Sequence, residues 1–460
     1  MLLEVCPIQI LEGCVNVPAS KPETQRAIIT ASLSPKKTRI LNPLYCSEVM
    51  MMRDACEAIG VTFKEEGELL EVTGIDIRKS DAPQLMINSS GSGLVFRIFT
   101  ALSSFMSKPS VVTGDSILCR RVMADLFEGL RTLGADIQSI CEPGKGPIIN
   151  WGKPLRGGHV TLPGNISSQF ITAILIAAPL AEEPTSISVT GELLSQSYIV
   201  QTITAMRSAG IQIEVDKEFR NFKVYPGQYN AQDLAIKEDY TSASYLLVAA
   251  ALLPGSLILN QVHLNSEQGE VYILEILRQM GIDSEYNPLT KQLRLNNRNP
   301  ELEGHFHFDV SNCPNIVPTL AALGAYVKGT FQITGAAITR FHKASRVEAM
   351  TSELKKLGVN INPLYKAGYC DGFEIKGAST YEGGVTFDSW KDHRIFMSLF
   401  VASLRAKKPC YLEGYERVIC SFPNFLKSFK DLGVKMAELG EDRKVVCAAK
   451  QPVQLAEIAV

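Results

Sequence analysis

Six copies of one pattern, an amphipathic helix followed by Gly and a short β-prone run, recur along the whole chain. The six segments are DACEAIGVTF, EGLRTLGADI, TAMRSAGIQI, EILRQMGIDS, SELKKLGVNI and KSFKDLGVKM. Successive glycines are separated by 74, 76, 71, 77 and 75 residues, at Gly60, Gly134, Gly210, Gly281, Gly358 and Gly433. Glycine just after a helix adopts the left-handed conformation that ends the helix. Six such sites at near-constant spacing predict a structural repeat.

A second element, an apolar helix with a polar N-terminal end, also recurs once in each copy. The six stretches begin SKPETQRAII, NSSGSGLVFRIF, NISSQFITAIL, EDYTSASYLLV, NCPNIVPTLAAL and WKDHRIFMSLF. Because these helices are apolar nearly all round, we expect them to be buried. A β-prone run such as TRILNP or SVVTGD follows each of them. Each unit is therefore predicted to contain a buried helix, a strand, a surface helix and two further strands.

These units predict an α/β protein with helices inside and sheets outside. A chain of 460 residues is too long for one ordinary core, so at least two domains are expected. We expect three repeats in each of two domains, one formed by residues 20–238 and the other by residues 239–460 together with residues 1–19. The leftover N-terminal strand would then join the second-half domain, and the chain would cross between the domains near residues 19–21 and 237–240.

The polar ends of the buried helices are candidates for a shared anion site. The N-terminus of a helix carries unpaired N–H groups and partial positive charge, so several such ends facing one cleft attract an anion. Cations lie close to these ends, namely Lys21, Arg26, Arg97, Arg121, Arg346, His393 and Arg394. Arginine binds phosphate or carboxylate through two parallel hydrogen bonds. The alternatives are that the polar residues only cap their helices, and that Asp392, His393 and Arg394 form a buried structural ion network.

Several other classes of function find no support in the sequence. The net charge of −2 gives no basic field for nucleic acid or membranes, and the longest apolar runs are about half of the ~20 residues that span a bilayer. The 11 cysteines form no CxxC pair, and the six histidines show no HExxH motif, so we expect neither a metal nor a disulfide framework. Walker, GxSxG and strand-linked GxGxxG motifs are also missing. We expect a cytoplasmic monomer without a cofactor.

Several short segments together match one family pattern. They are Ser20-Lys21 with Arg26, Ser92-Gly93 with Arg97, Thr113-Gly114-Asp115 with Arg121, Ser167-Ser168-Gln169-Phe170, Ser195 with Tyr198, Asp239 to Tyr245, and Asp392-His393-Arg394. With these segments in order and over essentially its full length, the chain resembles the 5-enolpyruvylshikimate-3-phosphate (EPSP) synthase family of enolpyruvyl transferases. The resemblance implies two inside-out α/β domains, each built from three βαβαββ units, with the active site in the cleft between them. It also implies transfer of the enolpyruvyl group of phosphoenolpyruvate to a hydroxyl, with shikimate-3-phosphate as the expected acceptor.

The same resemblance divides the site residues between the two substrates. The acceptor would be held by Arg26, Ser167, Ser168, Gln169, Ser195 and Tyr198. Phosphoenolpyruvate would be held by Lys21, Gly93, Arg121, Arg346, His393 and Arg394. This division is chemically sensible, because hydroxyl and amide groups suit a phosphorylated polyol, and a cation cluster suits a small molecule with both phosphate and carboxylate.

The chain departs from the family at positions that concern proton transfer. The acidic residue of the family's PD motif is Asn315 here, and the Lys-Glu pair of its KESDR motif is His342-Lys343. A proline, Pro22, follows Lys21, and Cys420 stands where a lysine is expected. We predict that Lys21, Asn315, His342 and Lys343 occupy the catalytic centre. Asn315 cannot titrate, whereas His342 could be a base near neutral pH or only a surface histidine.

Three functions therefore stay open from the sequence. The chain could be an EPSP synthase with altered proton chemistry, a relative that uses another acceptor or cyclic polyol, possibly in secondary metabolism, or an inactive anion-binding protein. The retained cations favour anion binding, and the lost acidic residues count against ordinary turnover. The synthase activity is the best single prediction.

Overall fold

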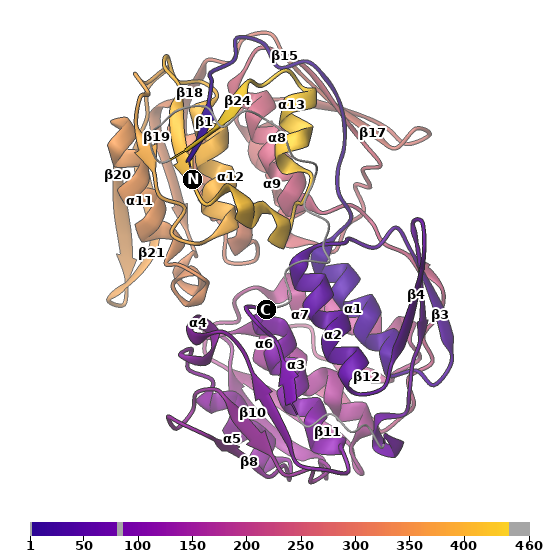
Figure 1. Cartoon of the computed structure of the whole chain (residues 1–460). Coiled ribbons are helices and arrows are strands. Elements are labelled where there is room, and N and C mark those ends of the chain that lie inside the picture. The colour runs from indigo at the N-terminus through magenta and orange to yellow at the C-terminus, as the bar shows by residue number, and fades with distance from the viewer. Residues whose placement is uncertain (1, 81–85, 441–460) are drawn as a thin grey trace.

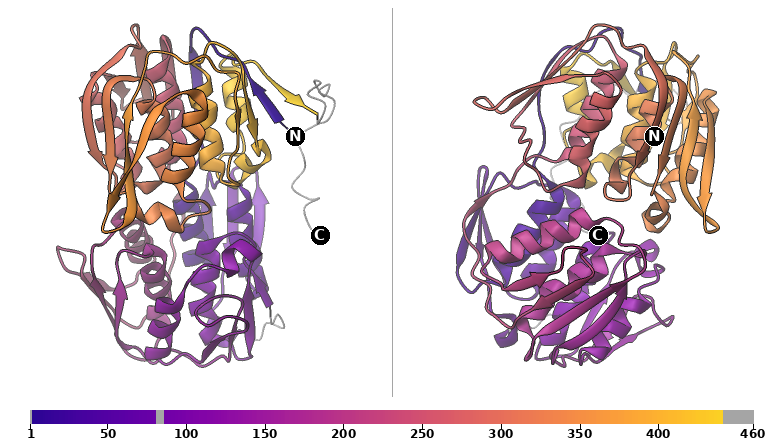
Figure 2. Two further views of the ribbon diagram at one scale, coloured as in Figure 1. Left: turned by 90° about the vertical axis from the view of Figure 1, so that its left-hand side faces the viewer. Right: turned by 180° about the vertical axis from the view of Figure 1, so that it is seen from behind.

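The computed structural model describes residues 2–80 and 86–440, and these residues form two domains stacked one above the other (Figures 1 and 2). One hydrophobic core draws its residues from Ala19 to Ile236. The other combines Leu3 to Val17 with Tyr240 to Val434. We call them the N domain and the C domain. Residue 1 and residues 441–460, which the sequence predicts to belong to the C domain, lie outside the described part.

Three four-stranded sheets cover the N domain, and their strands are arranged in the same way in all three. The first contains β14 (Leu234–Ala235), β3 (Lys37–Leu41), β5 (Leu69–Thr73) and β4 (Thr62–Glu66). The second contains β6 (Met86–Asn88), β7 (Ser110–Thr113), β9 (Ile148–Asn150) and β8 (Ile137–Ser139). The third contains β10 (Gly158–Pro163), β11 (Thr185–Thr190), β13 (Asn221–Val224) and β12 (Ile213–Val215). The first pair in each sheet is parallel and the other two are antiparallel.

The C domain repeats this arrangement with help from the N-terminal segment. Its first sheet contains β2 (Gly13–Asn16), β15 (Gly255–Asn260), β17 (Gln292–Asn297) and β16 (Ser284–Asn287). The second contains β18 (Leu302–Asp309), β19 (Val327–Thr334), β21 (Tyr369–Lys376) and β20 (Asn360–Lys366). The third contains β22 (Thr386–Phe387), β23 (Cys410–Glu413), β1 (Leu2–Val5) and β24 (Met436–Leu439). Strands β1 and β2 thus complete sheets whose other strands come more than 200 residues later.

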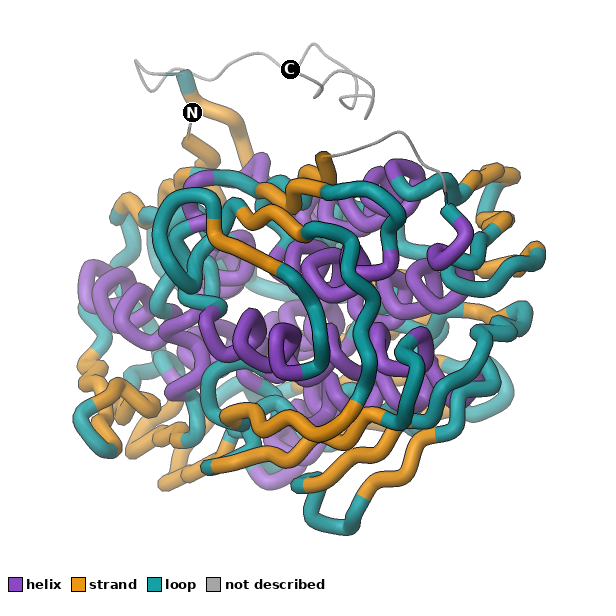
Figure 3. The backbone as a smooth tube through the Cα atoms, turned by 90° about the horizontal axis from the view of Figure 1, so that it is seen from below, coloured by secondary structure: helices purple, strands orange, loops and turns teal. Residues whose placement is uncertain are grey.

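The predicted buried helices are present in all six units. They are α1 (Lys21–Ser32), α3 (Gly93–Leu102), α6 (Ser168–Ala177), α8 (Tyr240–Leu252), α10 (Val317–Gly324) and α12 (His393–Ser403). In α8 every residue is buried, as its apolar sequence requires. Figure 3 shows helices filling the interior while strands lie mostly on the outside. The strands alternate accordingly: in β3, Thr38 and Ile40 point inward and their neighbours are exposed.

The outer helices end at the predicted glycines. These helices are α2 (Ser47–Ala58), α5 (Ala124–Thr132), α7 (Gln196–Ser208), α9 (Tyr272–Gln279), α11 (Arg346–Leu357) and α13 (Phe425–Asp431). All six repeat glycines have positive φ angles, between 78° at Gly281 and 110° at Gly134. A side chain would be strained in this conformation, which explains why glycine recurs there. The predicted βαβαββ repeat and the inside-out α/β fold are confirmed.

Shorter helices occupy the connections between these elements. A single extra turn of α-helix, α4 (Ser116–Cys119), precedes α5. The 3₁₀ turns are η1 (Ile77–Lys79), η2 (Ser103–Phe105), η3 (Ala178–Leu180), η4 (Gly269–Val271), η5 (Pro314–Ile316), η6 (Ala337–Phe341) and η7 (Tyr415–Cys420). Two of them, η4 and η5, carry Glu270 and Asn315, which contact Tyr198 of the N domain.

Two neighbouring segments connect the domains. Ala19 and Glu238 form an isolated antiparallel bridge. The Ser20 amide donates to the Lys237 carbonyl at 2.7 Å, and the Asp239 amide donates to the Pro18 carbonyl at 2.8 Å. The two cores divide at the same positions. These contacts make the connection a short pair of antiparallel segments.

Candidate active site

A cavity of about 350 Å³ between the domains contains every residue that the sequence assigned to the site. These residues are Lys21, Arg26, Gly93, Arg121, Ser167, Ser168, Gln169, Ser195, Tyr198, Asn315, His342, Lys343, Arg346, His393 and Arg394. They come from both domains and from positions more than 370 residues apart. The fold therefore gathers the predicted residues into one place, although this placement does not by itself test the role of each.

Buried helices direct their N-terminal ends at this cavity. Lys21, Gly93, Ser168 and His393 are the first residues of α1, α3, α6 and α12, and all four line it. The residues before these helices cap them: Ser20, Ser92, Ser167 and Asp392 each accept a hydrogen bond from a backbone amide in the first turn. Capping and ligand binding are thus compatible here, because four helix dipoles still point their positive ends at one space. No residue of α8 lines the cavity.

Glu48, on the first turn of α2, lies between two lysines of the cavity. Its two carboxylate oxygens accept from Lys21 Nζ at 2.6 Å and from Lys343 Nζ at 2.7 Å. Burial alone would raise the pKa of Glu48, but the attraction of Lys21 and Lys343 outweighs it and holds the pKa well below its usual range. Lys343 belongs to the C domain, so Glu48 ties the two domains together across the cleft.

A second link across the cleft joins Tyr198 of α7 to the C domain. The Tyr198 hydroxyl donates to Glu270 Oε1, and the Asn315 side-chain amide donates to the same hydroxyl oxygen. Asn315 Oδ1 accepts from Arg346 at 2.9 Å, and Arg346 Nε donates to Asp392 at 2.9 Å. Asn315 is therefore a fixed member of a network that runs from Glu270 to Asp392.

Asp392 and Arg346 form an almost fully buried ion pair, which agrees in part with the structural interpretation of the DHR segment. The exposed fractions of the two side chains are 0% and 5%. Burial opposes ionisation of Asp392, yet Arg346 and the capped helix end hold its pKa far below the usual range. Arg394 forms no ion pair with a carboxylate among the described residues, and it lines the cavity. Its pKa is raised, against the effect of burial, by Tyr245, Tyr198 and Asp239.

The other two arginines of the predicted helix ends are already engaged by the protein. Arg26 donates to Thr202 Oγ1 and to the Pro22 and Tyr198 carbonyls, at 2.9, 3.0 and 2.8 Å. Arg97 donates to Gln169 Oε1 at 2.6 Å and lies 5.4 Å from the centre of the Phe170 ring. Both guanidinium groups hold helices α1, α3, α6 and α7 together around the site, so direct contact of Arg26 with the acceptor stays a prediction.

His342 and His393 both belong to the cavity wall. His393 is buried, and neither of its ring nitrogens has a hydrogen-bond partner; the Nδ1 atom of His342 is likewise buried and unpaired. Burial lowers the pKa of both imidazoles well below the usual range, and the neighbouring Arg346 and Lys343 lower it further. His342 follows η6 and lines the cleft, so it is not a simple surface histidine.

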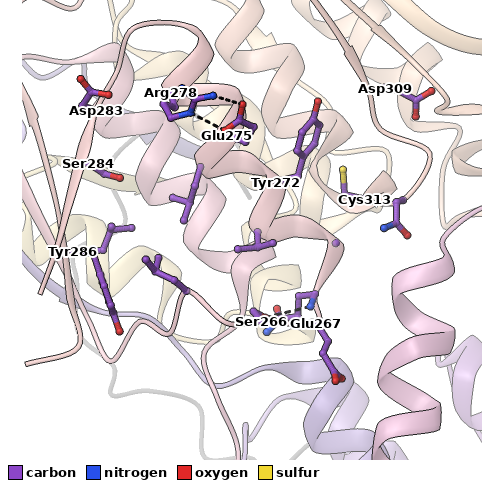
Figure 4. A pocket seen from close by; sticks show the side chains of 17 residues that line it. Ser266, Glu267, Tyr272, Glu275, Arg278, Asp283, Ser284, Tyr286, Asp309 and Cys313 are labelled. Carbon is purple, nitrogen blue, oxygen red and sulfur yellow. Dashed lines mark hydrogen bonds and ion pairs between the residues drawn. The ribbon is translucent and has the colours of Figure 1, made fainter. Parts of the chain in front are cut away.

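A larger cavity, of about 820 Å³, lies elsewhere among the described residues, and none of the predicted residues line it. Figure 4 shows that its wall combines Tyr272, Asp309 and Cys313 with an Arg278–Glu275 ion pair. Its polar groups do not converge on one point, and Arg278 is the one arginine that lines it. The chemistry of the cleft is therefore a better guide to the site than cavity size.

Two residues of the site, Glu48 and Glu270, were not predicted from the sequence. Both are acidic residues in the first turns of ordinary-looking helical segments, where an acid is common in any protein. The described residues contain no group of three or more His, Cys, Asp or Glu side chains that could hold a metal ion. No helix in the described ranges has the length and apolar character needed to cross a membrane.

Residues 5–429 match the family described as EPSP synthase (3-phosphoshikimate 1-carboxyvinyltransferase). The chain belongs to the EPSP synthase family. It is 35% identical over 434 residues to the 3-phosphoshikimate 1-carboxyvinyltransferase of Methanosarcina acetivorans, an alignment that covers 94% of this chain and 98% of the relative. The enzyme of the same name from Methanocaldococcus jannaschii is 33% identical over 445 residues, covering 95% and 99%. The predicted family and the prediction of an enzyme are confirmed.

Solved structures of the family share the fold of this member. The EPSP synthase of Acinetobacter baumannii superposes with a TM-score of 0.79 at 24% identity and covers 95% of this chain and 100% of its own. The enolpyruvyl transferase NikO of Streptomyces tendae gives a TM-score of 0.73 at 15% identity, with 95% and 98% covered. At these identities the likeness establishes the two-domain architecture and nothing about the substrate.

Proposed function

We propose that this family member transfers the enolpyruvyl group of phosphoenolpyruvate to a hydroxyl of shikimate-3-phosphate and releases phosphate. The observation that carries the proposal is the convergence of four helix N-termini with Lys21, Arg121, Arg346 and Arg394 in one interdomain cavity. The named activity of the relatives supplies the reaction. Such a cavity suits two substrates that together carry two phosphates and two carboxylates.

The two walls of the cleft suggest where each substrate lies. The N-domain wall offers Ser167, Ser168 and Gln169 at the start of α6 and Ser195 beside α7, which suit the phosphate and hydroxyls of the acceptor. Arg346, His393 and Arg394 on the C-domain wall, with Lys21 and Arg121 opposite, would hold phosphoenolpyruvate. Closure of the domains would then bring the acceptor hydroxyl against the enol carbon and exclude water.

The cleft also contains groups that can deliver a proton to the methylene carbon. Lys21 and Lys343 are ammonium groups held in place by Glu48. Burial lowers the pKa of Lys343, but Glu48 more than compensates and leaves it raised. We propose Lys21, at the tip of α1, as the proton donor. General acid–base assistance of this type contributes about 10²–10⁴ in rate.

A single chain supplies all of these residues, and we propose that the protein works as a monomer. The cysteines in the described part of the chain are free thiols, as is usual in the reducing cytoplasm. We also propose that the enzyme is cytoplasmic.

One observation favours an acceptor other than shikimate-3-phosphate. His342 lines the cleft from the C domain, at a position where the family motif carries a cation, and burial holds the pKa of its imidazole well below the usual range. A less anionic hydroxyl compound would suit this wall better than shikimate-3-phosphate does. An anion-binding protein without turnover is the remaining outcome.

Phosphate release tests these functions directly. The purified chain is incubated with phosphoenolpyruvate and either shikimate-3-phosphate, unphosphorylated shikimate or a panel of hydroxyl acceptors. We expect release with shikimate-3-phosphate, whereas release with another acceptor alone would replace it as the substrate. Arg121→Ala and Arg394→Ala should each weaken phosphoenolpyruvate binding by about 2–5 kcal/mol in calorimetry. Arg278→Ala, in the larger cavity, is the matched control and should bind normally; equal binding by all three variants would refute the site.

A further inference from the structure

The cleft has no obvious group to accept the proton of the acceptor hydroxyl. Asn315 cannot titrate. Glu48 is held by two lysines, and its depressed pKa makes it a weak base. Asp392 is committed to Arg346 and to the end of α12. His342 and His393 cannot readily gain a proton among Arg346, Lys343 and Arg394.

One buried carboxylate, Glu270 of η4, is in contact with the cleft through Tyr198. Glu270 is 1% exposed, and its Oε1 accepts a hydrogen bond from the Tyr198 hydroxyl. The described residues include no lysine or arginine within ion-pair distance of it. The charged and titratable groups around it are Tyr198, Asp239, Arg394 and Cys313, and burial raises its pKa despite the hydrogen bond from Tyr198. An incompletely neutralised buried carboxylate gains by taking up a proton.

The hydrogen bonds of Asn315 fix the direction in which protons can move. Asn315 Oδ1 is occupied by Arg346, so the other end of the amide must be the donor toward Tyr198. Tyr198 receives that hydrogen bond, and its own proton can only point to Glu270. A phenol oxygen has two lone pairs, so one remains for a hydroxyl in the cavity that Tyr198 lines.

We propose that Tyr198 is the catalytic residue that takes the acceptor proton, and that it passes its own proton to Glu270. The proposal rests on the proposed function, because it needs a reacting hydroxyl. In the addition step the acceptor oxygen bonds to C2 of phosphoenolpyruvate, and the C2=C3 electron pair takes a proton from the Lys21 ammonium. At the same time the hydroxyl proton moves to Tyr198 Oη and the phenol proton moves to Glu270 Oε1.

The elimination step restores the starting state. A C3 proton returns to the Lys21 amine, the bond from C2 to the phosphate oxygen breaks, and the double bond reforms. The departing phosphate takes one proton back through Tyr198 from Glu270. Every proton is then accounted for, and no oxidant or further reactant is required.

Three variants test this relay: Glu270→Gln, Tyr198→Phe and the matched control Glu267→Gln. Glu267 lies three residues away and also reaches the N domain, where it accepts from Thr204 Oγ1 at 2.8 Å. We expect Glu270→Gln and Tyr198→Phe to lower kcat by about 10²–10⁴ with nearly unchanged phosphoenolpyruvate affinity in calorimetry, while Glu267→Gln stays within about twofold.

The pH profile distinguishes proton transfer from a structural role. In the unaltered protein kcat should fall as pH falls through the pKa of Glu270, because the carboxylate must be ionised to accept a proton. Glu270→Gln should lose this acid limb along with its rate. An unchanged acid limb, or loss of phosphoenolpyruvate affinity with kcat retained, would overturn the relay. If the unaltered protein releases no phosphate with any acceptor, the proposed function fails and the relay fails with it. If the unaltered protein is active but Glu270→Gln and Tyr198→Phe keep its kcat, only the relay fails and the proposed function stands.

Discussion

Replacing Glu48 by Gln should loosen the closed arrangement of the two domains. Glu48 accepts from Lys21 and Lys343 at 2.6 and 2.7 Å, but only the bond to Lys343 crosses the cleft. A hydrogen bond to a charged group contributes about 1.5–3 kcal/mol, which corresponds to roughly a 10- to 100-fold change in the closed-to-open ratio. Glutamine keeps the shape and one acceptor oxygen, so we expect the lower end, about tenfold.

The substitution also leaves the cations of the cleft facing one another without an anion between them. Repulsion between them adds to the lost bond, and a bound anionic substrate should reverse both effects. Small-angle scattering should therefore give a larger radius of gyration for Glu48→Gln than for the unaltered protein without ligand. Saturating phosphoenolpyruvate should bring the two values together, because its phosphate replaces the missing negative charge.

The matched control is Glu192→Gln. Glu192 of the N domain pairs with Lys366 of the C domain at 3.5 Å, and both side chains are more than half exposed. Exposed pairs of this kind contribute little, so the control should scatter like the unaltered protein. Equal radii of gyration for all three proteins, with and without phosphoenolpyruvate, would refute the assignment of Glu48 as a clamp.

Two further predictions follow from the network around Tyr198. Adding Asn315→Asp to Glu270→Gln should raise kcat at least about tenfold above that of Glu270→Gln alone, because a carboxylate at position 315 offers Tyr198 another proton acceptor. A double variant no faster than Glu270→Gln would contradict this. Asp392→Asn should destabilise the protein near neutral pH by about 3–5 kcal/mol, since Arg346 stays buried without its partner. The pKa of Asp392 is depressed in the folded state, so the stability that its ionised form contributes is fully present above about pH 4 and is lost as the pH falls further. The free energy of unfolding, measured with denaturant between pH 3 and 7, should therefore fall less steeply with decreasing pH in Asp392→Asn than in the unaltered protein. Parallel curves for the two proteins would count against a contribution from the Asp392–Arg346 pair.

The repeat and the family motifs could be predicted because each depends on local sequence. A positive φ angle after a helix needs glycine wherever the helix lies, so six glycines at regular spacing revealed the units. The apolar helices had to be buried for a similarly local reason, because exposing a helix that is apolar all round to water raises the free energy of the protein. The division into residues 20–238 and residues 239–460 with 1–19 stays a proposal, which the membership of the two cores supports.

The roles of the acidic residues depended on the tertiary structure. Nothing near Glu48 in the sequence distinguishes it from any acid in the first turn of a surface helix, and Lys343 is 295 residues away. Glu270 and Tyr198 are 72 residues apart and belong to different domains. Whether a carboxylate is a clamp, a base or a cap is decided by the cations and donors within about 3 Å of it, because electrostatic and hydrogen-bond energies fall steeply with distance. The sequence by itself determined the repeat, the buried helices and the cations of the cleft, and only the folded chain decided which carboxylates those cations and the Tyr198 hydroxyl would meet.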